Sequence, residues 1–363
     1  MRVYDIDLLR GVIMAIMVVD HGREYAAGPG LVGDPMDLAT VTPLLYVLRW
    51  ISHFCAPVFA LLMGTSAALG RGATTGHLVT RGLILIALEF TVIDWSWTFY
   101  PLWPRKFFQV IGALGAASIL LGCLLPLGKR AVLAVGLAIV ALHNLFDGVS
   151  LNPSSAAHYV WAFMHQRSVL PLGAGFEVRT SYPFLPIAGV VLVGYGIGPW
   201  LFAGVRRRYL TAGAACLAVF AVLRVPNLYG DASRFTVGPD WARTLESLGN
   251  VTKYPLSLQF VLMTVGGALL FLAAFTGRRS AALQTLGRTP LFFYIAHLYA
   301  LHAAVLAWAW AAGFPPADFS RRFGGMPAEF GFPLWMSVPF ALAVTALLYP
   351  VCAWYGGRRL RYL

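Results

Sequence analysis

Long apolar segments, separated by short polar connections, follow one another along almost the whole chain. Most are close to the roughly 20 residues that a helix needs to cross the hydrocarbon core of a bilayer. The pattern therefore predicts an all-α fold, a polytopic integral membrane helix bundle, as a single transmembrane domain over residues 1–363. We expect about ten helices (10–11), with spans at residues 8–27, 44–69, 80–99, 107–127, 131–147, 182–203, 209–224, 256–277, 285–312 and 332–355.

The composition agrees with a membrane protein and excludes a nucleic-acid-binding one. Hydrophobic residues make up 59% of the chain and charged residues 12%, whereas soluble domains carry about 25% charged residues. The net charge of +12 comes from small basic clusters between apolar segments, not from a patch interleaved with stacking aromatics. The four cysteines are single and lie inside apolar runs, so we interpret them as small buried residues.

The polar connections alternate in character, and this alternation predicts the topology. Short basic connections follow the second, fourth, sixth and eighth spans, and the C-terminus is basic too. Longer connections of mixed charge follow the first, fifth, seventh and ninth spans. Cytoplasmic loops are the ones enriched in Lys and Arg, so both termini are predicted to be cytoplasmic. The basic clusters are Arg71 to Arg81, Lys129-Arg130, Arg206-Arg207-Arg208, Arg278-Arg279, and Arg358-Arg359 with Arg361.

Two outward-facing loops, residues 148–181 and 225–255, exceed the length of ordinary connections. Loops of this length usually bind a ligand or cover a site. Their aromatic and polar residues suit a carbohydrate or another polar ligand. Interfacial aromatic belts with solvated loop charges are the alternative interpretation.

The first apolar segment carries charge where a membrane helix should have little. Arg10 and His21 are eleven residues apart, so they return to within about 20° of one helix face with a rise of roughly 16 Å. Ionisable groups at membrane depth are functional-site candidates. Asp20 adjoins His21 but points about 100° away from it. Arg10 is also placed to pair with Asp7, so it either anchors the cytoplasmic end of the helix or faces an anionic cofactor.

Further polar residues interrupt the other spans. Arg49 and His53 share one helix face, and Pro57 is predicted to bend the same helix. Glu89 is the costliest intramembrane charge and should meet a cation or a water-filled space. His297 lies about 12 residues into its span, near the membrane midplane. A metal site at His21 and His297 is conceivable, but carboxylates at ligand spacing are lacking around this pair, so no metal is expected there.

A set of short motifs, in this order and spacing, resembles the heparan-α-glucosaminide N-acetyltransferase catalytic-domain family of transmembrane acyltransferases. The resemblance runs from about residue 3 to residue 312 and identifies the chain as a bacterial-type member. The ten residues between Arg10 and His21 are shared, more distantly, with the acyltransferase-3 group of sugar O-acyltransferases. The motifs are DLLRG (7–11), SHFCAPVF (52–59), FQVI (108–111), SYPFLP (181–186), NLYGD (227–231), KYPLS (253–257) and LGRTP (286–290).

The resemblance implies an enzyme of the inner membrane that takes acetyl-CoA from the cytoplasm as acyl donor. The acetyl group would pass to an amino sugar or related glycan acceptor on the opposite side of the lipid bilayer. A homodimer is compatible with the resemblance, and no metal is implied. We expect the catalytic group among His21, Asp20, His53 and His297, and binding of the CoA thioester by Arg10, Gln109, Arg288 and Lys253.

One position departs from the family. The lysosomal members resemble this chain around the first helix but carry Asn where His21 falls, with their proposed catalytic His slightly later. This chain has no His between Gly22 and Ser52. Either His21 replaces that histidine in space, or His53 or His297 is the base.

The chemistry stays open in two further respects. An intramembrane His either deprotonates the acceptor for direct attack on the thioester or carries the acetyl group covalently. Asn144, Gln109 or Lys253 could polarise the carbonyl oxygen. The competing functions are a proton-coupled solute transporter without acyl transfer and an O-acyltransferase acting on a cell-envelope glycan.

Overall fold

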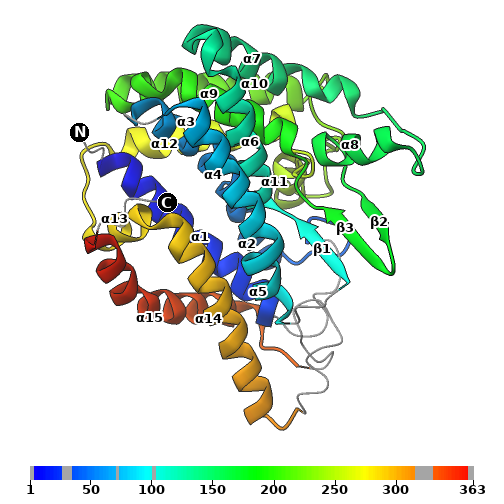
Figure 1. The fold of residues 1–363 in the computed structure, drawn as a ribbon, viewed down its shortest axis with the longest axis vertical. Coiled ribbons are helices and arrows are strands. Elements are labelled where there is room, and N and C mark those ends of the chain that lie inside the picture. Colours follow the sequence, from blue (N-terminus) through cyan, green and yellow to red (C-terminus); the bar gives the residue numbers. More distant parts are fainter. Residues whose placement is uncertain (1–3, 27–34, 71–72, 100–103, 315–329, 359–363) are drawn as a thin grey trace. The chain divides into compact units, whose positions relative to one another are not determined.

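The computed structural model describes residues 4–26, 35–70, 73–99, 104–314 and 330–358, and helices make up most of it (Figure 1). The predicted all-α, polytopic membrane fold is confirmed, with one small sheet in addition. Of the basic residues used for the topology, Arg71, Arg359 and Arg361 lie outside the described residues. The chain forms two compact units, unit 1 (Met1–Cys55, Val92–Trp103 and Gly277–Leu363) and unit 2 (Ala56–Thr91 and Pro104–Thr276). The predicted single functional domain is not tested by this division and stays a prediction.

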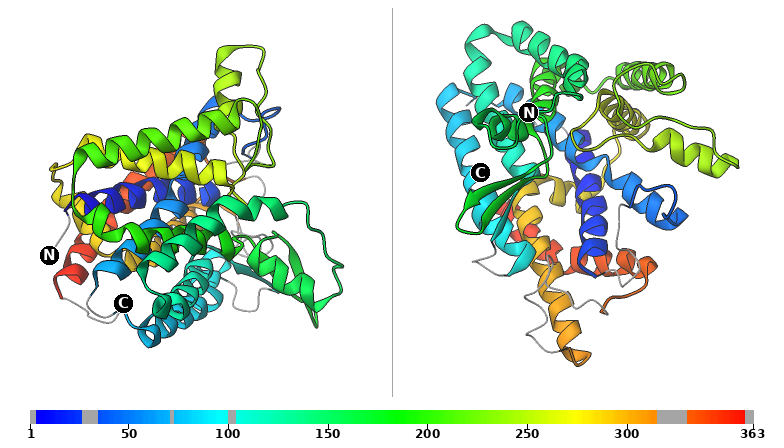
Figure 2. Two further views of the ribbon diagram at one scale, coloured as in Figure 1. Left: turned by 90° about the horizontal axis from the view of Figure 1, so that it is seen from above. Right: turned by 90° about the vertical axis from the view of Figure 1, so that its right-hand side faces the viewer.

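In unit 1, the N-terminal helix α1 (Tyr4–Ala26) packs against three helices from the C-terminal end of the chain, coloured yellow to red (Figures 1 and 2). Two glycines permit the closest approach. A Cβ on Gly11 would lie 1.9 Å from the carbonyl oxygen of Leu283, and a Cβ on Gly287 would lie 2.0 Å from that of Asp7. The other elements of unit 1 are α2 (Pro43–Ser52), α5 (Asp94–Thr98), α13 (Ala281–Arg288), α14 (Pro290–Ala311), the short η5 (Leu334–Met336) and α15 (Ser337–Gly357).

In unit 2, apolar helices pack in pairs, α4 with α6, α7 with α9, and α10 with α12. Small residues again allow the helix backbones to touch, since a Cβ on Gly64 would lie 1.9 Å from the carbonyl oxygen of Val191. The helices of unit 2 are α3 (Cys55–Leu69), α4 (Thr75–Leu88), α6 (Val110–Leu124), η2 (Leu125–Leu127), α7 (Lys129–Leu142), η3 (His143–Phe146), α8 (Ala156–Met164), α9 (Phe184–Phe202), α10 (Arg206–Arg224), α11 (Trp241–Gly249) and α12 (Leu258–Phe275).

Eight helical stretches among the described residues are long and apolar enough to cross a membrane, compared with the ten predicted spans. The other two predicted spans, 8–27 and 209–224, also form helices, α1 with 23 residues and α10 with 19. These two helices differ from the other eight in that they carry more charged residues. Acidic and basic residues occur near both ends of α1, while α10 opens with three arginines and ends on Arg224. For these two helices, crossing of the membrane stays a prediction.

Two predicted spans are each divided into two helices. Residues 44–69 break at His53 and Phe54, between α2 and α3, and not at Pro57 where we expected a bend. Pro57 lies in the first turn of α3, where its missing N–H removes no intrahelical hydrogen bond. The predicted span 285–312 breaks at Thr289. Pro290 is the first residue of α14, so it too lies in a first helical turn, where a missing N–H is tolerated.

Glu89 begins a π-helical turn, Glu89–Ile93, that joins α4 to α5, and its side chain is fully buried. Its Oε2 accepts a hydrogen bond of 2.6 Å from the backbone N–H of Gly112, in the first turn of α6. The unpaired N–H groups and the positive dipole end of a helix stabilise a carboxylate. A helix N-terminus therefore supplies part of the positive potential that we expected from a cation.

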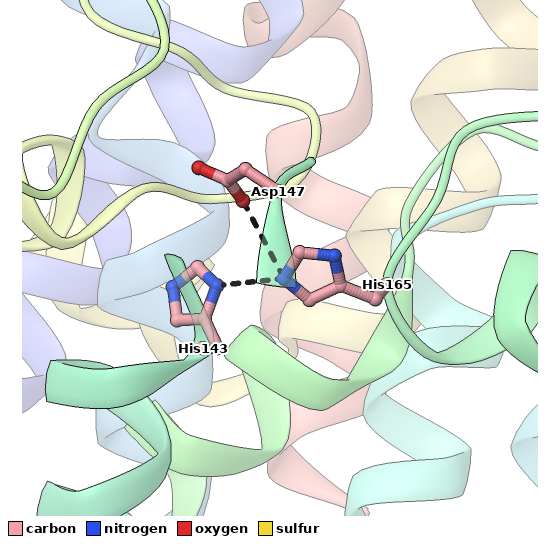
Figure 3. A group of neighbouring side chains, drawn as sticks. All are labelled: His143, Asp147 and His165. Carbon is pink, nitrogen blue, oxygen red and sulfur yellow. Dashed lines mark hydrogen bonds and ion pairs between the residues drawn. The ribbon is translucent and has the colours of Figure 1, made fainter. Parts of the chain in front are cut away.

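The two long predicted loops contain secondary structure. Residues 148–181 hold α8 and the strands β2 (Val169–Gly173) and β3 (Phe176–Thr180), while residues 225–255 hold α11. Strand β3 pairs in parallel with β1 (Arg105–Phe108) and antiparallel with β2, which gives the order β1-β3-β2. Beside this sheet, the end of α8 brings His165 next to His143 and Asp147 (Figure 3).

Loop 225–255 is held together by two polar side chains. The fully buried guanidinium of Arg224 donates hydrogen bonds to backbone carbonyls of Ser233, Ser247, Leu248 and Asn250. The carboxylate of Asp231 accepts from the backbone N–H groups of Ser233 and Thr252 and from the hydroxyls of Thr252 and Ser257. Asp231 thereby joins the motif at residues 227–231 to the motif at residues 253–257. These two motifs form one structural brace.

Candidate functional site

Two imidazoles from opposite ends of the chain meet in unit 1. His21 lies in α1 and His297 in α14, and Nδ1 of His21 is 2.7 Å from Nε2 of His297. The rings are parallel to within 2°, with centroids 5.0 Å apart. His297 is completely buried, while His21 is partly exposed. Two residues that the sequence singled out separately are therefore in direct contact.

A backbone carbonyl determines which nitrogens of this pair carry protons. Nδ1 of His297 lies 2.8 Å from the carbonyl oxygen of Phe293, and since a carbonyl only accepts, this nitrogen is the donor. In neutral His297, Nε2 is then an acceptor, so His21 donates to it from Nδ1. Neutral His21 therefore carries its lone pair on Nε2. A ring oriented in this way by a second group has the form of a general base or nucleophile.

Aromatic rings surround the histidine pair. Trp97 and Tyr294 contact His21 edge-on, with ring centroids 5.2 Å and 6.0 Å from its own. Trp97 stacks on Tyr25, which in turn stacks on His302. The Tyr25 hydroxyl and Nδ1 of His302 both donate to one backbone carbonyl of α5. The walls of the site are therefore held rigidly, and their apolar rings lower the local dielectric, which strengthens the hydrogen bond between the histidines.

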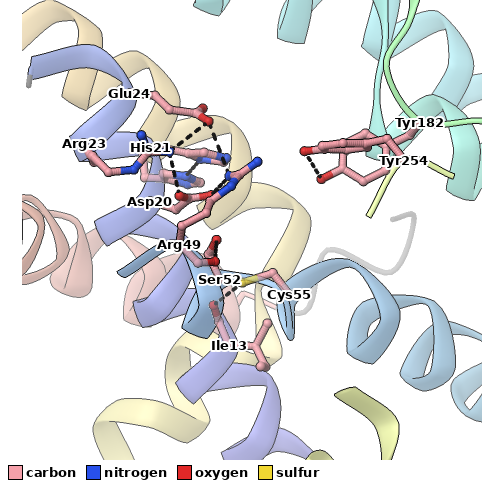
Figure 4. A network of polar contacts seen from close by, with 11 residues as sticks. Ile13, Asp20, His21, Arg23, Glu24, Arg49, Ser52, Cys55, Tyr182 and Tyr254 are labelled. Atoms are coloured by element: carbon pink, nitrogen blue, oxygen red, sulfur yellow. Dashed lines mark hydrogen bonds and ion pairs between the residues drawn. The ribbon is translucent and has the colours of Figure 1, made fainter. Parts of the chain in front are cut away.

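Asp20 belongs to a buried ion-pair network and not to the hydrogen bond of His21 with His297 (Figure 4). Its two carboxylate oxygens accept from Arg23 at 3.0 Å and from Arg49 at 2.8 Å. Glu24 lies 3.3 Å from the first arginine and 3.6 Å from the second, so two cations face two anions. Removing one partner from a buried pair costs about 3–5 kcal/mol. The network thus ties α1 to α2 at the end of α1 that carries His21.

Arg10 and Arg288, both predicted to bind the cofactor, share one carboxylate. Asp7 lies 3.4 Å from Nη1 of Arg10 and 3.8 Å from Nε of Arg288. The close packing of α1 on α13 through Gly11 and Gly287 brings them together. In this group two cations face the single carboxylate of Asp7, while Asp5 is a second carboxylate in the first turn of α1. Such an arrangement suits a phosphate group.

The remaining predicted site residues lie in different surroundings. His53 is the C-cap residue of α2 in unit 1 and is almost completely buried. Gln109 and Lys253 belong to unit 2, where Gln109 is the N-cap residue of α6 and Lys253 Nζ lies 5.4 Å from the ring centroid of Tyr254. Six of the eight predicted residues are thus in unit 1, and two are in unit 2.

Tyr254 is the centre of a group of cationic and aromatic side chains that come mainly from the two long loops, residues 148–181 and 225–255. The guanidinium of Arg167 lies 4.9 Å from the ring centroid of Tyr254. The Tyr254 hydroxyl donates a hydrogen bond of 3.3 Å to the Tyr182 hydroxyl. Burial, and then the charges of Arg167 and Arg105, lowers the pKa of Arg179. A concentration of positive charge beside aromatic rings fits the polar ligand expected at these loops.

Sequence reasoning did not single out Tyr25, Trp97, Arg23 or Glu24. Arg23 could have been found, because it lies three residues after Asp20 on the same helix. Tyr25 and Trp97 gave no signal of their own, since aromatic residues near span ends are common in membrane proteins. Their position beside His21 depends on the packing of α5 against α14.

Two comparisons with known proteins bear on this site. Residues 2–227 match the family described as heparan-alpha-glucosaminide N-acetyltransferase, catalytic. The matched segment contains α1 with Arg10, Asp20 and His21, and it contains His53 and Gln109. It ends before His297, Lys253 and Arg288. No curated protein gives a significant match to the chain.

Proposed function

Because the chain belongs to the heparan-alpha-glucosaminide N-acetyltransferase catalytic family, we propose that it is a membrane-embedded acetyltransferase. Its donor would be cytoplasmic acetyl-CoA, and its acceptor an amino sugar or related glycan on the opposite side of the membrane. The observation that carries this proposal is the hydrogen bond between His21 and His297, which leaves a lone pair on Nε2 of His21. A histidine oriented in this way can take up and return a proton during acyl transfer.

Two routes use this nitrogen. In the direct route, Nε2 of His21 takes a proton from the acceptor amine, the amine nitrogen attacks the thioester carbonyl, and the C–S bond breaks. The proton then passes to the departing CoA thiolate. In the covalent route, Nε2 attacks the carbonyl itself, the C–S bond breaks and CoA leaves as the thiolate. The acceptor amine then attacks the acetyl carbon, the bond from that carbon to Nε2 breaks, and the amine proton passes to the released Nε2. In both routes His297 accepts the Nδ1 proton of His21 in a hydrogen bond and holds the ring in place.

The CoA moiety carries phosphates, and the cationic group Arg10–Asp7–Arg288 would bind them. Substituting Arg10→Gln is expected to raise KM for acetyl-CoA by about tenfold or more, since a charge-assisted hydrogen bond contributes about 1.5–3 kcal/mol. kcat should change little, because this contact is the same in the ground state and the transition state. Steady-state kinetics of the purified enzyme at several acetyl-CoA concentrations measure both constants.

A matched control for this prediction is Arg234→Gln, which removes the same charge from an exposed position in the outer loop. Its KM should equal that of the wild type. If Arg10→Gln leaves KM unchanged as well, Arg10 is a structural partner of Asp7 and does not bind the donor.

The proposed function itself is tested by incubating the purified, detergent-solubilised chain with acetyl-CoA labelled in the acetyl group. Transfer of label to members of an amino-sugar panel is the expected result, and stability of the product to hydroxylamine distinguishes an amide from an ester. An ester product would favour the O-acyltransferase alternative. Absence of any label transfer, together with proton-dependent solute uptake into vesicles, would replace the enzyme with a transporter.

A further inference from the structure

A second group of histidines lies in unit 2, apart from the residues used in the proposed reaction (Figure 3). His143 and Asp147 come from the end of α7 and the turn after it, and His165 caps the C-terminus of α8. Nδ1 of His143 lies 3.1 Å from Nε2 of His165, and that same Nε2 lies 3.6 Å from Oδ1 of Asp147. All three ligand-type atoms fall within 4.8 Å of one another.

With protons alone, Nε2 of His165 makes a favourable contact with only one of its two neighbours at a time. If Nε2 carries a proton, that single N–H is shared between two acceptors, Nδ1 of His143 and the carboxylate of Asp147. If Nε2 carries the lone pair, it accepts from His143 and faces an ionised Asp147 oxygen lone pair against lone pair, a conflict that only protonation of Asp147 relieves. A divalent cation among the three atoms accepts all three lone pairs at once.

Surrounding side chains fix Asp147 and His165 in the way that outer partners fix metal ligands. The amide nitrogen of Asn144 donates to Oδ2 of Asp147 at 2.8 Å, which leaves Oδ1 directed at His165. The Asn144 carbonyl accepts from the backbone N–H of Leu258 at 2.9 Å, so this side chain is itself fixed. The ring of Trp161 stacks on that of His165, with centroids 4.9 Å apart. Hydrogen-bonded carboxylates and oriented imidazoles are typical around metal ligands.

We infer that His143, Asp147 and His165 form a binding site for a zinc ion. Two imidazoles and one carboxylate are a ligand set that Zn²⁺ takes with a fourth position open. Bond lengths of about 2.0–2.1 Å in a tetrahedral site place ligand atoms about 3.3 Å apart; two of the three separations, 3.1 Å and 3.6 Å, lie on either side of that value, and the third is within 4.8 Å. The sequence gave no expectation of a metal here, because His165 is distant in the chain from the pair at residues 143 and 147.

The ion would brace the outer region of unit 2. It joins the end of α7 to the end of α8, and α8 precedes the strands of the small sheet. Joining α7 to α8 requires no acetyl transfer, so the zinc site can be tested independently of the proposed function. Asp147 is the most exposed of the three side chains, at 28%, and provides the access from solvent.

The test is metal analysis of the full-length protein, purified with a tag that contains no histidine and dialysed against buffer with micromolar ZnCl₂. We expect about one zinc per chain by mass spectrometry of the metal. His143→Ala and His165→Ala should lose it, and Asp147→Asn should weaken binding at least about tenfold. The matched control His158→Ala removes another buried histidine of α8 and should retain the ion.

Thermal unfolding gives the second measurement. Zinc should raise the Tm of the wild type and of His158→Ala in a concentration-dependent way, but should leave the Tm of His165→Asn unchanged. A folded His165→Asn that still binds one zinc would overturn the inference, as would a wild type that binds none. In the latter case the two imidazoles share a hydrogen bond only. Cobalt substitution adds a spectroscopic check, since tetrahedral Co²⁺ in the wild type should give visible absorption that both alanine variants lack.

Discussion

Replacing His21 with alanine is expected to lower acetyl transfer by about 10²–10⁴-fold, the range that a positioned general base contributes. The substitution removes the Nε2 lone pair that the hydrogen bonds to His297 and Phe293 specify. Binding of acetyl-CoA should persist, because the cationic group at Arg10 is unchanged. Initial rates of label transfer, compared at equal amounts of monodisperse protein, measure the effect.

His77→Ala is the matched control for this prediction, since His77 is exposed in the first turn of α4. It should keep wild-type activity. Wild-type activity in folded His21→Ala would instead transfer the assignment to His53 or His297. A rapid burst of acid-labile label on the wild type without acceptor, lost in His21→Ala, would identify the covalent route.

The second large effect is expected at His297, as a residue that positions His21. In His297→Ala the Nδ1 proton of His21 loses its acceptor, so the ring can turn or take the other tautomer. We expect kcat to fall by about 10- to 100-fold, as it does when groups that orient a functional histidine are removed, with KM for acetyl-CoA nearly unchanged. Steady-state kinetics separate the two constants.

His297→Gln distinguishes positioning from packing. A glutamine side chain offers a carbonyl oxygen to His21 and should restore kcat to within about tenfold of the wild type. His297→Leu fills a similar volume without an acceptor and should behave like alanine. Equal activity of the glutamine and leucine variants would show that His297 contributes volume alone.

The general architecture could be predicted from the sequence, because apolar length reports membrane helices directly. The cost of burying His21 and His297 also made them candidates one at a time. Their contact, however, joins residues 276 positions apart, and no periodicity encodes the packing of α1 on α14. The ion pair of Asp7 with Arg10 lies within one helix, but its ion pair with Arg288 joins two helices that are distant in the sequence, so the sequence does not predict it.

At other places the structure differs from the sequence-based expectation, or adds to it, for identifiable reasons. Pro57 was expected to bend a helix, but the chain instead ends one helix before it and starts another. Glu89 was expected to meet a cation or a water-filled space, and its contact with the backbone N–H of Gly112 adds a helix N-terminus that the sequence did not indicate. The sheet was not foreseen, because β1 pairs with β3, a strand about 70 residues later, and each strand has only four or five residues.

The charges of α1 bear on the order in which the protein is made. This helix is synthesised first, yet the helices that cover it, α13, α14 and α15, are synthesised last. The charges of α1 lie near its two ends, and a charge carried to the bilayer centre would cost about 2.5–3.5 kcal/mol, so we expect α1 to reach its most favourable environment only after its partners exist. We therefore expect biogenesis to depend on the segment from Ala281 onward, roughly the last quarter of the chain. Until residues 281–357 have left the ribosome, the helix that bears His21 lacks the helices that pack against it.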